Sequence, residues 1–291
     1  MADLSGTPLD GGALLAGLQA AVDFAWYWQE PDAEDRGFAS QAAREALRPV
    51  AEAVAAAARA QDVRWWTTPV DRDRQRYAQF LDQHPLPEPA PGQAAESVAA
   101  WLADTLEDER VAHGRPEDPA APYSGRWWST PAHSRLPVTT RALPALGAVR
   151  LALAEDGLGW QSARCWPAMP DNGARVYEIH GPVQWAQLAD RYPLDVSKSR
   201  RHDWWRVTGW SGRWLIPDYA AVAADWDAVH VTVAGYLTTA GIAIPAGDGA
   251  RTMLAGWDPD ATWWLNDVLS FTGPPEDWRR DDQAPLGWTR V

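Results

Sequence analysis

Tryptophan occupies 20 of the 291 positions of this chain, and this density constrains its fold more than any other feature. Each indole ring removes a large apolar area from water, so most of these side chains are expected to fill a globular core. A minority are expected to line a ligand site, because an indole face also stacks on sugars, bases, nicotinamide and cations. The sequence therefore predicts an aromatic core with a few rings left for binding.

The rest of the composition is that of an ordinary globular protein. Hydrophobic residues make up 46% of the chain, and no run approaches the roughly 20 apolar residues of a membrane helix. The segment Met1–Leu4 has neither the basic nor the apolar region of a secretory signal. The single cysteine, Cys165, excludes a disulfide framework and a cysteine zinc site, and its strand-like surroundings predict a packed thiol. These features predict a cytoplasmic protein without a metal site.

The charge balance narrows the classes of partner. The chain has 39 acidic and 26 basic residues, which gives a formal net charge of -13. A field of that sign repels nucleic acid and anionic membranes, so neither is an expected partner. A small-molecule ligand fits better, and the sequence does not indicate the oligomeric state.

The first part of the chain has mainly helical periodicity. Helices are expected at 10–30, 40–59 and 93–113, a strand at 62–68, a short charged helix at 71–82 and a proline-rich linker at 84–92. Ser40 is a plausible N-cap of the second helix, and Pro49 is expected to kink it.

The second part changes to short β-type runs. Strands are expected at 125–130, 149–154, 175–179, 229–238 and 252–257, with helices near 183–192 and 218–225. The prediction is an α+β fold, with a helical N-terminal part (1–118) packed on a mainly antiparallel, tryptophan-rich sheet (119–291). The two parts are compatible with a single body.

One short segment occurs twice. Arg64–Pro69 reads RWWTTP, and Arg126–Pro131 reads RWWSTP. The copies could form two walls of a binding site, but two similar strand ends, each stopped by proline, are the favoured explanation.

Glutamate is rare in the second part, which makes its positions informative. After residue 140 it occurs only at Glu155, Glu178 and Glu276. Strand alternation places Glu178 and His180 on one face, as a pair for acid–base chemistry or as part of a solvated surface. Glu155 ends a predicted strand and is a second candidate carboxylate.

Three further regions contain candidate residues. His230 lies on an apolar strand, where a packed histidine is commoner than a catalytic one. Asp258-Pro259-Asp260 indicates a turn, and a cation site there would need a third ligand. Arg200 and Arg201 beside Trp204 and Trp205 suit an anionic group on a flat ring, or else an anchored loop.

The stretches VYEIHGPVQWAQLADRYPLDV, RHDWWRVTG and LAGWDPDATWWL, all between Val176 and Trp264, resemble a group of tryptophan-rich actinobacterial proteins. That resemblance implies no activity. A second resemblance, to ADP-ribosyltransferase-type domains, rests on Ser129-Thr130-Pro131, the short strands and a late acidic residue. It implies NAD as a ligand, although no Glu-x-Glu or Gln-x-Glu pair follows residue 140.

Two functions remain open at this point. The first is an enzyme acting on a nucleotide-like or glycosidic small molecule, with ADP-ribosyl transfer as its most specific form and catalytic groups among Glu178, His180, Glu155 and His230. Its ligand-binding residues would be Arg200, Arg201, Trp204, Trp205 and Trp128. The second is a non-catalytic interaction protein whose exposed aromatic side chains form a partner surface.

Overall fold

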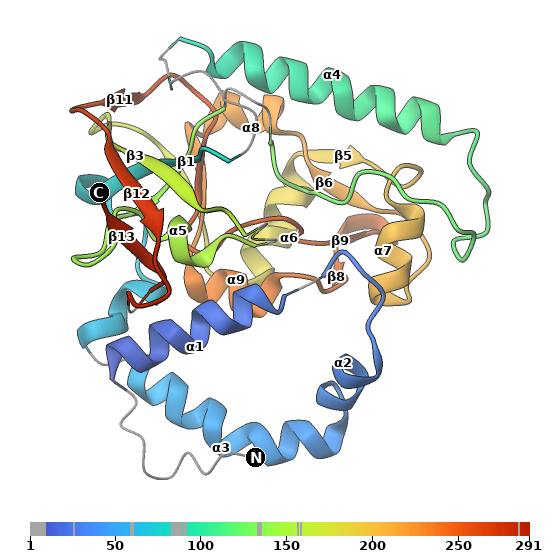
Figure 1. Cartoon of the computed structure of the whole chain (residues 1–291). Helices are drawn as coiled ribbons and strands as arrows, with labels where there is room; N and C mark the ends of the chain where they lie inside the picture. Colours follow the sequence, from blue (N-terminus) through green and yellow to red (C-terminus); the bar gives the residue numbers. More distant parts are fainter. Residues whose placement is uncertain are drawn as a thin grey trace.

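A large sheet flanked by helices forms the body of the protein (Figure 1). The computed structural model describes residues 10–25, 27–58, 61–82, 89, 92–132, 136–155, 157, 159–284 and 286–291. The helices are α1 (Gly11–Asp23), α2 (Ala33–Phe38), α3 (Gln41–Ala58), α4 (Ala94–Ala112), α5 (Arg150–Leu153), α6 (Pro182–Arg191), α7 (Arg201–Thr208), α8 (Tyr219–Asp225) and α9 (Val233–Thr239), with 3₁₀ turns η2 (Gln61–Thr67), η3 (Arg72–Arg74) and η4 (Gly247–Gly249). The expected α+β class is confirmed.

The strands of the large sheet follow the order β13-β12-β3-β1-β2-β10-β7-β4, and β11 pairs with β3. The strands are β1 (Gln75–Phe80), β2 (Val138–Arg141), β3 (Ser162–Pro170), β4 (Val176–Ile179), β5 (Pro193–Asp195), β6 (Leu215–Pro217), β7 (Ala228–Val231), β8 (Ile244–Pro245), β9 (Arg251–Thr252), β10 (Thr262–Trp264), β11 (Leu269–Phe271), β12 (Glu276–Arg280) and β13 (Trp288–Arg290). Only β4 and β7 pair in parallel within this sheet, which confirms its mainly antiparallel character. Strand β1 lies between β3 and β2, so the first part of the chain contributes a central strand.

The two faces of the sheet carry unequal cores. On one face, residues such as Val229 and Trp263 belong to the main hydrophobic cluster, which also takes in side chains of α1, α5, α6 and α9. On the other face, Ala228 and Trp264 belong to a cluster of only five buried residues. His230 lies two residues after Ala228 and therefore points to this thinner face. Polar side chains accumulate there.

Most tryptophans serve the core, as predicted. The buried ones are Trp66, Trp101, Trp127, Trp166, Trp185, Trp204, Trp214, Trp257, Trp263, Trp264, Trp278 and Trp288. Several pack edge to face, including Trp204 with Trp214 at 5.0 Å between ring centroids. Among the described tryptophans, Trp28 and Trp128 are the exposed ones, at 47% and 50%.

Long periodic segments form the expected elements. Helices α1, α3, α4, α6 and α8 lie within or close to their predicted ranges. Ser40 Oγ accepts a hydrogen bond from Ala43 N at 3.2 Å, as an N-cap does, and Pro49 lies inside α3. Cys165 is buried in β3, and burial raises the pKa of its thiol to about 12, so the packed thiol is confirmed.

Two predictions in the first part are wrong. Residues 62–68 were expected to form a strand because of the paired aromatic side chains, but they lie in the 3₁₀ turn η2 and its end. Residues 71–82 were expected to form a charged helix, but η3 leads there into β1. The many charged residues of 71–82 suggested a surface helix. Residues 75–80 instead form a strand, because they pair with β2 and β3.

Predictions for the second part fail where segments are short. The 149–154 segment forms helix α5, because its Leu and Ala side chains are buried on all sides rather than on one face. The 229–238 strand ends at Val231, and Thr232 caps α9 by accepting from Gly235 N at 2.9 Å. Only the two residues of β9 are extended near 252–257, and 125–130 is irregular.

Trp26, and residues 84–88, 90 and 91 of the expected linker, lie outside the described residues. Within the described part, no helix combines the length and apolar character that crossing a membrane requires.

Candidate functional site

The turn from Gly256 to Asp260, between β9 and β10, is the meeting point of several predicted site residues. Gly256 and Asp260 both have positive φ, at 73° and 62°, so the chain reverses sharply at each end. The turn predicted from Asp-Pro-Asp is present. In addition, both of its aspartates form ion pairs with arginines from distant segments.

Asp260 forms the more buried of these ion pairs. Its Oδ1 lies 2.7 Å from Arg141 Nε, and its Oδ2 accepts from the backbone N of Arg141 at 2.8 Å. The side chains of Arg141 and Asp260 are 5% and 1% exposed. The Arg141 guanidinium also lies 5.0 Å from the centre of the Trp65 ring. Arg141 therefore links the turn to the first RWWTTP segment.

His230 lies between two carboxylates. Its Nδ1 is 2.5 Å from Glu178 Oε2, and its Nε2 is 3.5 Å from Asp260 Oδ1, which is long for a hydrogen bond. Burial alone would lower the pKa of His230. The hydrogen bonds and negative charges of Asp260 and Glu178 outweigh burial and raise that pKa to about 9. His230 is therefore an imidazolium at neutral pH.

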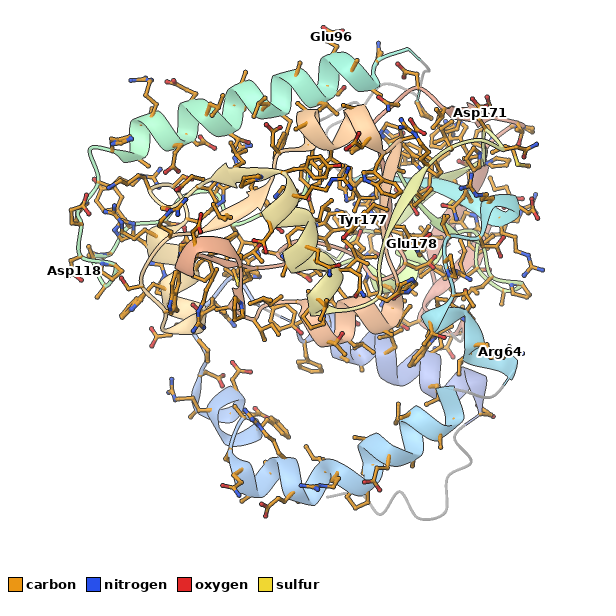
Figure 2. The ribbon with its side chains drawn as sticks, turned by 180° about the vertical axis from the view of Figure 1, so that it is seen from behind. Arg64, Glu96, Asp118, Asp171, Tyr177 and Glu178 are labelled. Atoms are coloured by element: carbon orange, nitrogen blue, oxygen red, sulfur yellow. The ribbon has the colours of Figure 1, made fainter. Side chains whose placement is uncertain are left out.

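Glu178 is the end of this charged chain nearest to solvent. Its side chain is 19% exposed, and its Oε1 accepts from Val70 N at 3.0 Å. Figure 2 shows Glu178 next to Tyr177 in the central part of the molecule. Glu178, His230, Asp260 and Arg141 alternate in sign, so the buried network is neutral overall. Both oxygens of Glu178 are engaged, which suits a positioning role better than proton transfer.

Asp258 organises the other side of the turn. It lies 2.7 Å from Arg150 Nε, and its Oδ1 accepts from the backbone N of Glu155 at 2.8 Å. Glu155 in turn accepts from Gly256 N at 3.2 Å through Oε1. Glu155 is thereby fixed against the start of the turn, with 8% of its surface exposed.

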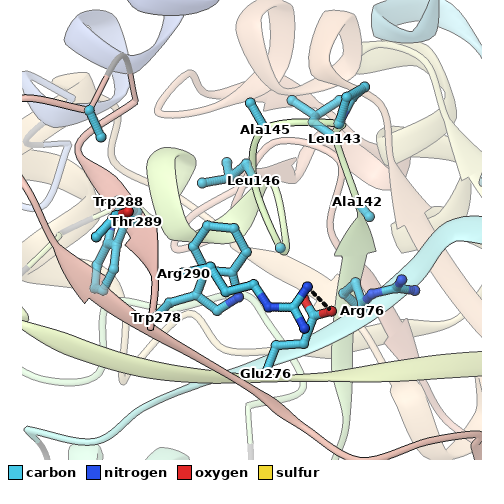
Figure 3. A pocket seen from close by; sticks show the side chains of 13 residues that line it. Arg76, Ala142, Leu143, Ala145, Leu146, Glu276, Trp278, Trp288, Thr289 and Arg290 are labelled. Carbon is cyan, nitrogen blue, oxygen red and sulfur yellow. Dashed lines mark ion pairs between the residues drawn. The ribbon is translucent and has the colours of Figure 1, made fainter.

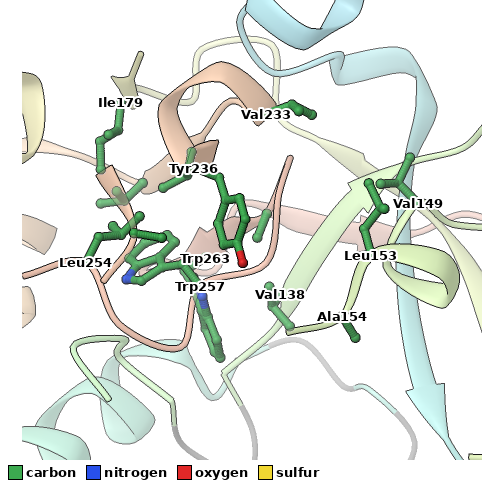
Figure 4. Close-up of a cluster of buried hydrophobic side chains, with 14 of the residues drawn as sticks. Val138, Val149, Leu153, Ala154, Ile179, Val233, Tyr236, Leu254, Trp257 and Trp263 are labelled. Carbon is green, nitrogen blue, oxygen red and sulfur yellow. The ribbon is translucent and has the colours of Figure 1, made fainter. Parts of the chain in front are cut away.

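Two tyrosines surround Glu155. Burial and the charge of Glu155 raise the pKa of Tyr27 to about 12, and the same causes raise the pKa of Tyr236. Both phenols therefore stay protonated at neutral pH. Figure 4 shows the Tyr236 ring among the core side chains, close to Trp257 and Trp263. Glu155 is thus a carboxylate beside two neutral hydroxyl groups that can donate hydrogen bonds.

Trp128 stands beside the turn on a tightly held segment. Four successive carbonyls each accept a hydrogen bond from a buried side chain: Trp127 from Trp204 (2.8 Å), Trp128 from Arg200 (3.1 Å), Ser129 from Tyr219 (2.9 Å) and Thr130 from Trp101 (3.0 Å). Ser129 Oγ also accepts from Ala255 N at 2.8 Å. The backbone that carries Trp128 is therefore fixed, and its half-exposed indole lies against Gly256.

Replacing Gly256 with alanine is expected to displace Trp128. A Cβ at this position would clash with the indole ring, and φ is positive. We expect the free energy of unfolding to fall by about 2–3 kcal/mol, measured by urea denaturation. Gly209→Ala is the matched control, since Gly209 also has positive φ but has open space around it. Equal losses in the two variants would show that Trp128 does not pack on Gly256.

Of the other predicted site residues, two support the backbone that carries Trp128, and the rest lie elsewhere. Arg200 is 1% exposed, and burial lowers its pKa to about 10; Trp204 is fully buried. Both support the Trp128 segment. Arg201 donates a hydrogen bond to the backbone carbonyl of Pro116 and forms an ion pair with Glu117 at 3.2 Å. His180 is exposed beyond the end of β4, and Trp205 is partly buried; no hydrogen bond or ion pair within the described part joins either to the turn.

The sequence alone did not single out Arg141, Arg150 or Tyr236. Arg141 and Asp260 are 119 positions apart, and Arg150 and Asp258 are 108 apart. Two residues so far apart along the chain have no spacing pattern that would reveal their contact.

Comparison with known proteins adds no relative, because no family model, curated protein or solved structure matches the chain.

Proposed function

We propose that the protein is an enzyme acting on a glycosidic or nucleotide-like small molecule at the Gly256–Asp260 turn. One observation carries this proposal: the carboxylate of Glu155 and the half-exposed ring of Trp128 both lie against Gly256, at the start of the turn. A fixed indole beside a buried carboxylate suits a ligand with a ring and a developing positive charge.

Trp128 is the binding platform in this proposal. A sugar or base stacks on its free face, and the four bonded carbonyls fix the backbone that carries the ring. Pre-organisation of this kind reduces the entropy lost when a ligand binds.

Glu155 is the catalytic carboxylate. The bond between the anomeric carbon and its leaving group breaks, and the electron pair departs with the leaving group. The positive charge left on the sugar ring is stabilised by Glu155. Water or an acceptor hydroxyl then adds to the anomeric carbon and gives its proton to the carboxylate, which passes it to an anionic leaving group or, where the leaving group departs neutral, to solvent. In the ADP-ribosyl version, the substrate is NAD and the leaving group is nicotinamide.

A thermal-shift screen with NAD, nucleosides and simple sugars tests the proposal. A bound ligand at about 100 times its Kd is expected to raise Tm by roughly 5 °C or more. Trp128→Ala should abolish the shift, whereas Phe38→Ala, which truncates an aromatic ring 59% exposed on α2, should retain it. Absence of a shift with every compound would refute the proposal.

The chemistry is tested on the compound that this screen identifies. Glu155→Gln should keep the fold and the ligand-induced shift but lower kcat by about 100-fold or more. Glu117→Gln, at a carboxylate 77% exposed, is the control and should leave kcat unchanged. Full activity in Glu155→Gln would exclude Glu155 from the reaction.

A second candidate function is a protein-interaction surface on α2 and α3. None of the described side chains of α2 or of residues 41–57 is buried, and both helices stand at the margin of the molecule (Figure 1). Phe38 on α2 and Leu47 on α3 are exposed at 59% and 40%. A protein that acts only through this surface gives no shift in the small-molecule screen, so the same experiment separates the two functions.

A further inference from the structure

An open pocket of about 530 Å³ lies near the β12–β13 edge of the large sheet. Strand register places Trp278 and Arg76 on the face opposite to that of Glu178 and His230. The loop from Ala142 to Gly147 forms one wall (Figure 3). None of the residues that line it belongs to the Gly256–Asp260 turn, and neither Glu155 nor Trp128 is among them, so this pocket is distinct from the proposed site.

The pocket is lined by two arginines, Arg76 and Arg290, but by only one carboxylate, that of Glu276. Glu276 and Arg290 form an ion pair at 3.1 Å, with side chains 29% and 64% exposed. Arg76 donates to the backbone carbonyl of Gln75 at 3.1 Å, and no carboxylate of the described chain lies within ion-pair distance of it. In a chain with a net charge of -13, a pocket with an excess positive charge favours an anion.

Apart from Thr289, the rest of the lining is apolar or aromatic. Trp278 and Trp288 are 8% and 4% exposed, and neither indole nitrogen has a hydrogen-bond acceptor among the described residues. A Cβ on Gly147 would lie 2.5 Å from Nε1 of Trp278, so the polar edge of this ring faces the loop. Leu143 and Leu146 complete the apolar wall.

We propose that this pocket binds a small aromatic carboxylate. The carboxylate pairs with Arg76, whose planar guanidinium can donate two parallel hydrogen bonds to it. The aromatic ring lies against the apolar wall of Leu143, Leu146 and Trp278. The volume falls within the range of about 300–1,000 Å³ typical of small-molecule sites.

Titration calorimetry with phenylacetate tests this site, and phenylacetamide serves as the uncharged analogue. We expect phenylacetate to bind and the amide to bind at least about tenfold more weakly. Arg76→Met, which keeps most of the aliphatic stem, should weaken phenylacetate binding about tenfold. Arg279→Met is the matched control, because Arg279 is an exposed residue of β12 whose side chain alternates to the other face.

Glu276→Gln provides a test that does not depend on how Arg76→Met folds. Removal of this carboxylate leaves Arg290 unpaired, so phenylacetate should bind several-fold more tightly than to the unmodified protein. Equal binding of acid and amide, equal effects of Arg76→Met and Arg279→Met, or weaker binding in Glu276→Gln would overturn the proposal.

Discussion

Asp260→Asn is expected to lower the free energy of unfolding by about 3 kcal/mol, because it leaves Arg141 buried without a counter-ion. Asparagine tolerates the positive φ of 62° at this position, so the substitution removes charge without straining the backbone. The loss corresponds to a fall in Tm of roughly 6–12 °C, measurable by calorimetry.

Asp282→Asn is the control for this substitution. Asp282 also faces an arginine, Arg280, at 3.6 Å, but its side chain is 85% exposed. Solvent screens such a pair, so the control should leave Tm almost unchanged. Equal Tm values for the two variants would mean that the Arg141–Asp260 pair does not hold the turn in place.

A second large effect is expected with pH. The folded pKa of His230, about 9, lies above the ordinary value of 6.5, so folding favours the protonated ring. The stability that His230 contributes is complete below pH 6.5 and is lost as pH rises through 9. Its size is on the order of 3 kcal/mol.

Urea denaturation between pH 6 and 9.5 measures this loss. The unmodified protein should lose stability as pH rises, whereas His230→Gln should show a nearly flat profile over this window. His202 has the opposite effect on stability, because burial and the charge of Arg201 lower its folded pKa. The stability that it contributes therefore increases with pH, and it does so at lower pH than the loss from His230. Its contribution is already complete above pH 6.5. Parallel profiles for the unmodified protein and His230→Gln would contradict the charged state of His230.

The sequence was most informative where an element is long or strongly capped. Helices α3 and α4 have periodic apolar positions, and Ser40 caps α3 as predicted. Short segments were less predictable, because burial on all sides removes the alternation that distinguishes strand from helix. The α5 segment, in which Leu151, Ala152 and Leu153 are all buried, illustrates this limit.

The sequence pointed to several individual residues of the candidate site, but it did not show that they lie close together. Glu155, Glu178, His230 and Trp128 were singled out by type and local pattern, yet nothing in the sequence placed them around one turn. Strand alternation offered His180, two residues away, as a candidate partner of Glu178, with a solvated sheet face as the alternative. The parallel pairing of β4 with β7 places His230 directly beside Glu178. Pairing across a sheet, unlike alternation along a strand, has no local signal.

Fluorine NMR on protein labelled with 5-fluorotryptophan gives the most direct test that ligands bind beside Gly256–Asp260. The labelled protein is titrated with the compound that produces the largest thermal shift, and the Trp128 resonance is identified by its loss in Trp128→Phe. We predict that this resonance moves in proportion to saturation. A Trp128 resonance that stays in place at saturation, while that of Trp278 moves, would place the ligand in the other pocket and contradict the proposed site.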